Sequence, residues 1–415
     1  MIPKRLETPS LASLAGALRY PNYRLWFAGQ SVSLIGTWMQ IVAQQWIVYE
    51  MTGSKFLLGA VSFAGSIPIL FLMLPAGVLA DRHPRRSILL YTQTGAMLLA
   101  FLMMLLLAQG VLEVWHVFVL AALLGVVNSV DAPARHSFII EIIDDRKDLP
   151  HAIALNSTIF NLARVIGPAV AGIILAAWGA VWCFGANGLS FLAVIAGLLL
   201  MRIPLSAESV LHRADRRIWE GVRDGLGYAL RHPVILPAIL ITMTAGVFSF
   251  SYSTLLPAFA VEVLHQGETA LGLLNTAVGI GAVLGSLYMA SRAHLGRRLP
   301  VLVLGSVLFP LSLLAFAFCG NYLLSLGFLV FAGFGLVVQN TSINSLVQTL
   351  VDDNLRGRVM SLYLLSFFGA VPFGALQAGA VAQVLGPVTG MAISAGLGLM
   401  LALGILVASP GLRRI

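Results

Sequence analysis

The ten residues Gly77-Val78-Leu79-Ala80-Asp81-Arg82-His83-Pro84-Arg85-Arg86 form a charged connection between two apolar runs, at approximately residues 56–80 and 87–109. Each run is long enough to cross a bilayer, because one crossing needs roughly 20 apolar residues. Outward from this connection, further apolar runs occur at approximately 25–49, 114–140, 152–176, 181–201, 234–261, 271–290, 300–318, 322–350, 359–384 and 387–408. The sequence therefore predicts an all-α integral membrane protein with twelve transmembrane helices.

The composition excludes a soluble globular domain. Hydrophobic residues make up 59% of the 415 residues and charged residues only 10%, whereas charged residues are about a quarter of an ordinary soluble domain. Cys183 and Cys319 are the two cysteines, and their spacing indicates neither a disulfide framework nor a metal site.

The basic residues predict the orientation in the membrane. If the N-terminus is cytoplasmic, 23 of the 25 Lys and Arg residues fall on the cytoplasmic side, which is the side that retains basic residues during insertion. Lys55 lies outside and Arg164 lies within a span. We therefore expect a multi-pass protein of the cell (inner) membrane with both termini in the cytoplasm. The net charge of +8 is then a topogenic signal, and no nucleic-acid partner is expected.

An internal repeat predicts two parallel halves. Leu18-Arg19-Tyr20-Pro21 before the first span matches Leu230-Arg231-His232-Pro233 before the seventh, at an offset of 212 residues. Six spans are an even number, so both copies start on the same side, as in carriers built from two related six-helix bundles. The expected units are 1–202 and 233–415, joined by a cytoplasmic linker at 203–232 that contains a short amphipathic surface helix.

The first span carries a polar face. Its residues Gln30, Ser33, Thr37, Gln40 and Gln44 are spaced 3, 4, 3, 4 and share one side of a helix. Because amides facing lipid are costly, we expect this face to line a central aqueous cavity that binds substrate. At the 212-residue offset, span seven supplies Thr242, Ser249 and Tyr252; Trp38 flanks the row, and Asn344 adds a polar group in span ten. Hydrogen bonding between helices without a ligand is the alternative.

Proton coupling needs a carboxylate inside the membrane, and Asp131 is the acidic residue placed within a span. Arg164 in span five is its expected partner, since matching the two spans about residue 146 puts Arg164 three residues, or roughly 4.5 Å, deeper. The hypothesis is that Asp131 and Arg164 form a pair that breaks when a proton binds. A static pair, or a bond from Asp131 to Arg135 one turn further along, is the alternative.

Two further segments predict conformational change. In span five, Gly167, Pro168 and Gly172 combine a helix-breaking residue with two positions that lack side-chain bulk, as a helix hinge would. In the connection between spans two and three, Gly77, Asp81, Arg82, Arg85 and Arg86 are expected to stabilise the outward-facing state by closing the cytoplasmic side. For the arginines, a purely topogenic role is the alternative.

At this connection the chain resembles the major facilitator superfamily, whose signature loop is similar to Gly77–Arg86. Gly167-Pro168 followed by Gly172 is similar to the motif of the superfamily's exporters. Three segments are similar to the enterobactin-exporter and macrolide-efflux (drug:proton antiporter) branch: Asn22–Trp26, Asp131–Arg135 and Arg356–Ser361. The resemblance implies the major facilitator fold and an exporter. The fourth-span Arg common in drug–proton antiporters is missing between Trp115 and Gly125.

These observations predict a secondary active exporter of small organic molecules, such as an amphipathic drug or a siderophore-like solute. It is expected to be proton-coupled, to work by alternating access and to act as a monomer. The three lysines follow Pro3, Ser54 and Arg146, so there is no phosphate-binding loop of a nucleotide-driven pump. We expect no enzymatic activity, catalytic residue, metal or cofactor. The alternatives are a lipid or lysolipid transporter, and a non-transporting receptor or channel on the same scaffold.

Overall fold

The computed structural model describes residues 15–145, 147–202, 218–292, 298–352 and 355–412, and within these ranges it is built from helices and contains no strand. The first half contains a short 3₁₀ helix, η1 (Ala15–Arg19), and six long helices: α2 (Pro21–Thr52), α3 (Lys55–Arg82), α4 (Arg85–Ala108), α5 (Val114–Glu141), α6 (Leu149–Trp178) and α7 (Ala180–Leu200). These six helices form one bundle, in which α2 packs on α6 and α7 while α5 packs on α3 and α4.

The second half repeats this plan with two interrupted spans. The seventh span is made of α9 (Ile235–Thr244), the π-helical turns η3 (Ala245–Ser249) and η4 (Phe259–Val263), and α10 (Tyr252–Ala258) between them. The remaining spans are α11 (Glu268–Arg292), α12 (Leu299–Ala317), α13 (Tyr322–Leu350), α14 (Arg356–Phe368) with α15 (Ala370–Leu385), and α16 (Pro387–Ala408). Gly179 and Gly386 connect the last two spans of each half with φ angles of 83° and 84°, a left-handed conformation that suits glycine.

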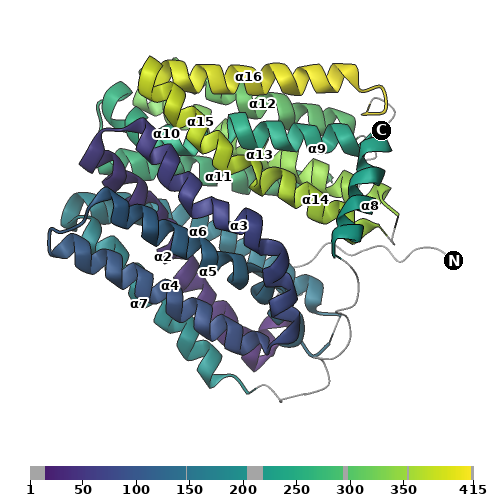
Figure 1. The fold of residues 1–415 in the computed structure, drawn as a ribbon, viewed down its shortest axis with the longest axis horizontal. Helices are drawn as coiled ribbons and strands as arrows, with labels where there is room; N and C mark the ends of the chain where they lie inside the picture. Colours follow the sequence, from purple (N-terminus) through teal and green to yellow (C-terminus); the bar gives the residue numbers. More distant parts are fainter. Residues whose placement is uncertain (1–14, 146, 203–217, 293–297, 353–354, 413–415) are drawn as a thin grey trace.

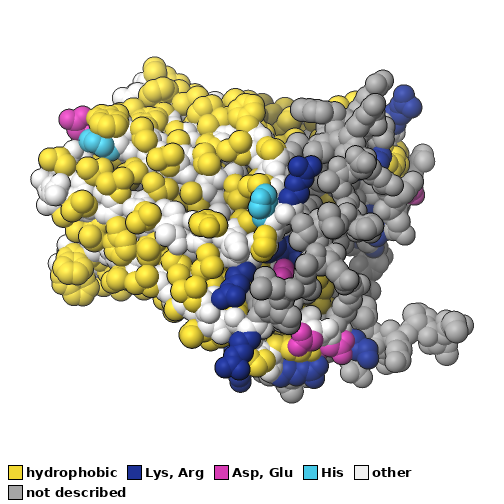
Figure 2. Space-filling view, turned by 60° about the horizontal axis from the view of Figure 1, so that its bottom comes forward, with side chains coloured by type: hydrophobic (Ala, Val, Ile, Leu, Met, Phe, Trp, Pro, Cys, Tyr) yellow, Lys and Arg dark blue, Asp and Glu magenta, His cyan; other side chains and the backbone are white. Residues whose placement is uncertain are grey.

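The twelve-span architecture is confirmed. Eleven helical segments of the described chain are long and apolar enough to cross a bilayer. The twelfth is α2, whose 32 residues exceed the length of a crossing and whose polar face lowers its mean hydropathy. Large apolar side chains cover the outer surface, among them Leu98, Leu199 and Met400 at 59%, 60% and 64% exposure. Figure 2 shows this apolar surface, with Lys and Arg side chains gathered towards one end.

We call that end the linker end. It carries α8 (Ile218–Arg231), the start of α4 and the C-terminal end of α16. Helix α8 lies in the part of the linker where a surface helix is expected, and it packs against α14, with Gly225 next to Arg358. Residues 203–217 of the linker lie outside the described residues. The opposite end, where α2 ends and α3 begins, is called the distal end.

The two bundles contact each other mainly through two pairs of helices, α6 with α11 and α3 with α15, and α10 adds smaller contacts with α2 and α3. The main pairs are the fifth and eighth spans and the second and eleventh, as a two-fold relation between the halves requires. A Cβ atom on Gly272 of α11 would lie 2.5 Å from the carbonyl oxygen of Pro168, and one on Gly59 of α3 would lie 2.3 Å from the carbonyl oxygen of Ala375 in α15. From these contacts the bundles diverge towards the linker end (Figure 1).

Candidate functional site

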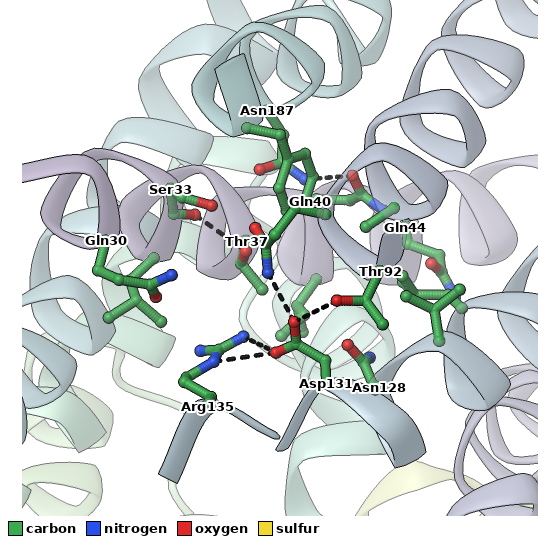
Figure 3. Close-up of a pocket in the computed structure, with 17 residues that line it drawn as sticks. Gln30, Ser33, Thr37, Gln40, Gln44, Thr92, Asn128, Asp131, Arg135 and Asn187 are labelled. Atoms are coloured by element: carbon green, nitrogen blue, oxygen red, sulfur yellow. Dashed lines mark hydrogen bonds and ion pairs between the residues drawn. The ribbon is translucent and has the colours of Figure 1, made fainter. Parts of the chain in front are cut away.

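The polar face of α2 lines a cavity inside the first bundle (Figure 3). All five residues of the face border it: Gln30, Ser33, Thr37, Gln40 and Gln44. The other walls come from α4, α5 and α7, and the cavity volume is about 120 Å³. That is room for a few water molecules and less than the roughly 300–1,000 Å³ of typical organic-ligand sites.

The expectation that this face lines a cavity between the two bundles is therefore wrong in its location. All residues of the cavity wall belong to the first six spans. The physical reason is that helical spacing assigns residues to a common face but does not say which neighbouring helix that face meets. Trp38 lies on a different side of α2, against Phe160 and Arg164 of α6.

Asp131 is the buried charge of this cavity, with 3% of its side chain exposed. Its Oδ1 accepts hydrogen bonds from Thr92 Oγ1 and Gln93 Nε2, each at 2.8 Å. Its Oδ2 accepts from Arg135, from Nε at 2.9 Å and also from Nη2. Both carboxylate oxygens thus accept hydrogen bonds, and Oδ2 also pairs with a cation, which compensates a charge within a bilayer.

The expected pairing of Asp131 with Arg164 is not found. Asp131 bonds instead to Arg135, four residues along the same helix, which is the alternative considered from the sequence. Arg164 lies over the ring of Trp38, 5.7 Å from the ring centre, and beside the side chain of Tyr252. Matching the two spans about residue 146 predicts how deep each residue lies in the membrane. It does not predict the direction in which each helix points the side chain.

Several polar residues of the cavity escaped the sequence argument. Asn187 of α7 donates from Nδ2 to Gln40 Oε1 at 2.5 Å, and Ser190 Oγ donates to the Asn187 side chain at 3.1 Å. Thr92, Gln93, Asn128 and Arg135 complete the polar wall. The sequence feature that could have identified these residues is an amide or hydroxyl side chain within an otherwise apolar membrane-spanning run. Gln30 Nε2 and Gln93 Oε1 are buried without a protein partner among the described residues, which suits a cavity that holds water.

The corresponding residues of the second half do not form a matching face. Thr242 is fully buried and donates to the carbonyl of Ala238 at 2.9 Å. Ser249 is buried beside Gly398 of α16. Tyr252 reaches the first bundle through Arg164. Asn344 of α13 accepts a hydrogen bond from Gln348 at 2.5 Å. The expectation that Thr242 and Ser249 line one cavity together with the polar row of α2 is therefore wrong, since neither borders the cavity described above.

The connection between α3 and α4 makes its described contacts within the first bundle. Arg85 pairs with Glu141 of α5 at 3.3 Å. Arg86 donates to the carbonyls of Leu198 and Leu199 at 2.7 and 3.0 Å, where a cation stabilises the C-terminal end of α7. Arg82 is exposed and Gly77 has open space around it. The side chain of Asp81 lies outside the described residues.

The glycines of span five are close-packing positions. A Cβ atom on Gly167 would lie 2.5 Å from Trp38 Cβ, and one on Gly172 would lie 3.0 Å from the carbonyl oxygen of Thr269 in α11. Helix α6 continues unbroken through Pro168. Bending at this site remains a prediction.

A group of polar contacts joins the bundles at the distal end. Lys55 of the first bundle pairs with Glu262 of the second at 2.5 Å, and the Tyr49 hydroxyl also donates to Glu262. Gln383 Oε1 of α15 accepts from the backbone N–H groups of Lys55 and Phe56 at 2.9 and 3.3 Å, at the N-terminus of α3. The described polar contacts thus close the distal end.

Two ionisable groups outside the spans are perturbed at the linker end. A hydrogen bond from Tyr20 and the charge of Arg19, 2.5 Å away, hold the pKa of Asp148 below its ordinary value. Burial lowers the pKa of His232. The His232 Nδ1 accepts from the N–H groups of Val234 and Ile235 at 3.2 and 3.3 Å, and so caps the start of α9.

Known proteins that are similar to this chain are also membrane transporters built from helices. The model of a family described as "transmembrane secretion effector" matches residues 12–413. The chain belongs to this family of the major facilitator superfamily. The secretion-effector family consists of transporters, so the chain is a multi-pass membrane transporter and not an enzyme, and the resemblance found in the sequence is confirmed.

Three curated relatives are similar to this chain over most of their length. The staphyloferrin A transporter of Staphylococcus aureus (strain NCTC 8325 / PS 47) is 27% identical, covering 88% of this chain and 90% of the relative. The multidrug efflux pump Tap of Mycolicibacterium fortuitum is 27% identical, covering 85% and 87%. The enterobactin exporter EntS of Citrobacter koseri (strain ATCC BAA-895 / CDC 4225-83 / SGSC4696) is 27% identical, covering 95% and 94%.

A solved structure shares the fold. The crystal structure of a bacterial homologue of the iron transporter ferroportin, in an inward-facing state, superposes with a TM-score of 0.72 at 20% identity, covering 96% of this chain and 99% of that one.

Proposed function

We propose that this chain is a secondary active exporter of small organic molecules that works by alternating access as a monomer. The observation that carries the proposal is the one-sided contact between the bundles, joined at the distal end through Glu262 and divergent at the linker end. Two units, 1–202 and 233–415, tilt about the contacts of α6 with α11 and α3 with α15, and residues 203–232 connect them. The relatives described as a multidrug efflux pump and an enterobactin exporter support this direction of transport.

The proposed location is the cell (inner) membrane, with the linker end in the cytoplasm. The support is the charge distribution, since basic side chains gather at the linker end (Figure 2) and cytoplasmic connections of membrane proteins are enriched in Lys and Arg. The conformation described here is then inward-facing.

Asp131 is the proposed proton carrier, with Arg135 rather than Arg164 as its partner. Protonation removes the negative charge that holds Arg135, which is itself 31% exposed. The guanidinium is then free to turn towards the linker end. At an assumed ~150 mV one proton supplies roughly 3.5 kcal/mol, enough for about a 300-fold gradient of a neutral solute. A single carboxylate therefore suffices for coupling.

The test uses purified protein in liposomes and a panel of labelled organic anions, neutral amphipathic drugs, organic cations and a lysolipid. We expect wild type to accumulate a soluble member of the panel when a pH gradient is imposed, and also to exchange it without one. Asp131→Asn is expected to keep exchange and to lose the response to the pH gradient. Accumulation of the lysolipid alone would favour a lipid transporter.

Asp148→Asn is the matched control, because Asp148 also bonds to an Arg and a hydroxyl group but lies at the membrane surface. It is expected to behave as wild type. Full pH-driven accumulation by Asp131→Asn would exclude Asp131 as the proton carrier. Failure of every solute to exchange in wild type would exclude the transport proposal itself.

A further inference from the structure

Arg164 is a cation in the middle of the membrane. It lies 15 residues after Leu149 and 14 before Trp178, the two ends of α6, so it is about 22 Å from the start of the helix. A charge at this depth is costly unless a partner or water compensates it. A charged residue at this depth therefore indicates a functional role for Arg164.

No carboxylate of the described residues lies within 4 Å of the Arg164 side chain. Three other arginines of the first bundle differ from it: Arg135 and Arg85 each pair with a carboxylate, and Arg86 donates to two backbone carbonyls. The described contacts of Arg164 are aromatic: the ring of Trp38 at 5.7 Å and the phenol of Tyr252. Its positive charge therefore has no anionic counterpart in the described chain.

The exposure of α6 shows where this cation points. Ile153, Ser157 and Phe160 precede Arg164 at helical intervals and share its side of α6, and Ala171 continues the same side towards the distal end. Ile153 and Phe160 are 52% and 46% exposed, whereas Ala171 is fully buried. This side of the helix is thus open near the linker end and closed near the distal end, with Arg164 at the transition.

The open space lies between the bundles and not in the lipid. The side of α6 opposite Arg164 carries Leu162, Ile166 and Ile173, which are 47%, 41% and 58% exposed and have the apolar character of a lipid-facing surface. Tyr252, in contact with Arg164, belongs to the second bundle. Arg164 therefore lies where the exposed part of this side of α6 ends, next to Tyr252 of the second bundle.

Aromatic rings surround this position. Trp38 meets Phe160 edge to face, with ring centres 5.8 Å apart, and Tyr252 lies on the other bundle. A guanidinium forms paired, charge-assisted hydrogen bonds with planar oxyanions, and aromatic rings bind flat apolar groups. We propose that Arg164 binds the carboxylate or similar planar oxyanion of the transported molecule, while Trp38, Phe160 and Tyr252 contact its apolar body. This rests on the proposed export function and names its substrate class: amphipathic organic anions.

The test measures binding without transport, using full-length protein in lipid nanodiscs. The probes are 2-naphthoate and its neutral counterpart 2-naphthamide, which have the same ring and nearly the same shape. We expect wild type to bind the anion at least tenfold more tightly than the amide. Arg164→Gln is expected to bind both equally, and Arg164→Lys to keep part of the preference because the charge remains.

Arg292→Gln is the matched control. Arg292 also lies over an aromatic ring, that of Tyr288 at 5.3 Å, but at the exposed end of α11, and its loss should leave the preference unchanged. Trp38→Leu is expected to weaken both probes without changing their ratio, and it tests the site even if Arg164→Gln does not fold. Equal binding of both probes by wild type, or a preserved preference in Arg164→Gln, would overturn the proposal. Neither result would contradict export itself, which is tested separately by pH-driven accumulation in liposomes.

Discussion

Replacing Glu262 by Gln should shift the protein from the conformation described here towards one that is open at the distal end. Glu262 joins the bundles by an ion pair to Lys55 and a hydrogen bond from Tyr49. The side chains of Lys55 and Glu262 are 15% and 33% exposed, so the pair is intermediate between a surface ion pair, worth about 0.2–1 kcal/mol, and a buried charge-assisted hydrogen bond, worth about 1.5–3 kcal/mol.

The glutamine amide keeps one acceptor oxygen, so part of the hydrogen bonding survives the substitution. We therefore expect a net loss of about 1.4 kcal/mol from the distally closed state, which is a tenfold change in the ratio of the two conformations. The effect should fall at high salt, because the contact is partly exposed.

The assay is electron spin resonance distance measurement in nanodiscs, on a background without Cys183 and Cys319. One label pair reports the linker end, at Ser87 and Ser291, and the other reports the distal end, at Gln109 and Gln266. In Glu262→Gln we expect more of the long distance at the distal end and more of the short distance at the linker end.

Glu268→Gln is the control, because Glu268 begins α11 at the same end and has no ion pair among the described residues. Unchanged distances in Glu262→Gln would refute the reasoning, as would an equal shift in Glu268→Gln.

Three further outcomes concern stability, each measured by thermal unfolding in detergent. Gly272→Val should destabilise the protein by about 1–3 kcal/mol, because the new side chain meets the backbone of α6, whereas Gly404→Val has open space and should be neutral. Arg86→Gln should lower the free energy of unfolding by about 1–2 kcal/mol, because it removes the hydrogen bonds to the C-terminal carbonyls of α7. Arg82→Gln, at an exposed position, should change it little. Because burial lowers the pKa of His232, its contribution should be complete above about pH 6.5 and lost as the pH falls through the lowered pKa; His232→Asn should flatten this dependence, and an identical pH profile would contradict it.

The number of spans followed from the sequence because hydropathy depends on the residues of each helix alone. The polar row of α2 was also visible, since its 3, 4, 3, 4 spacing is a property of one helix. Its neighbours were not: whether Gln40 meets Asn187 of the same bundle or the opposite bundle depends on how each helix is rotated. Asp131 and Arg164 illustrate the same limit, because a predicted difference in depth of only about one turn does not imply that the two side chains point towards each other. Glu262 and Lys55 lie 207 residues apart, and only the packed bundles bring them together.

Asp131 and Arg135 form an ion pair within one turn of the same helix, α5. Protonation and helix movement are therefore expected to affect this pair differently. Both charges belong to α5, so a tilt of one bundle against the other as a rigid body does not by itself separate them. Under the proposed coupling, protonation of Asp131 is the event that releases the Arg135 guanidinium. The proposed pH response would then depend on water reaching the cavity beside Asp131, and we expect it to survive substitutions that loosen only the contacts between the two bundles.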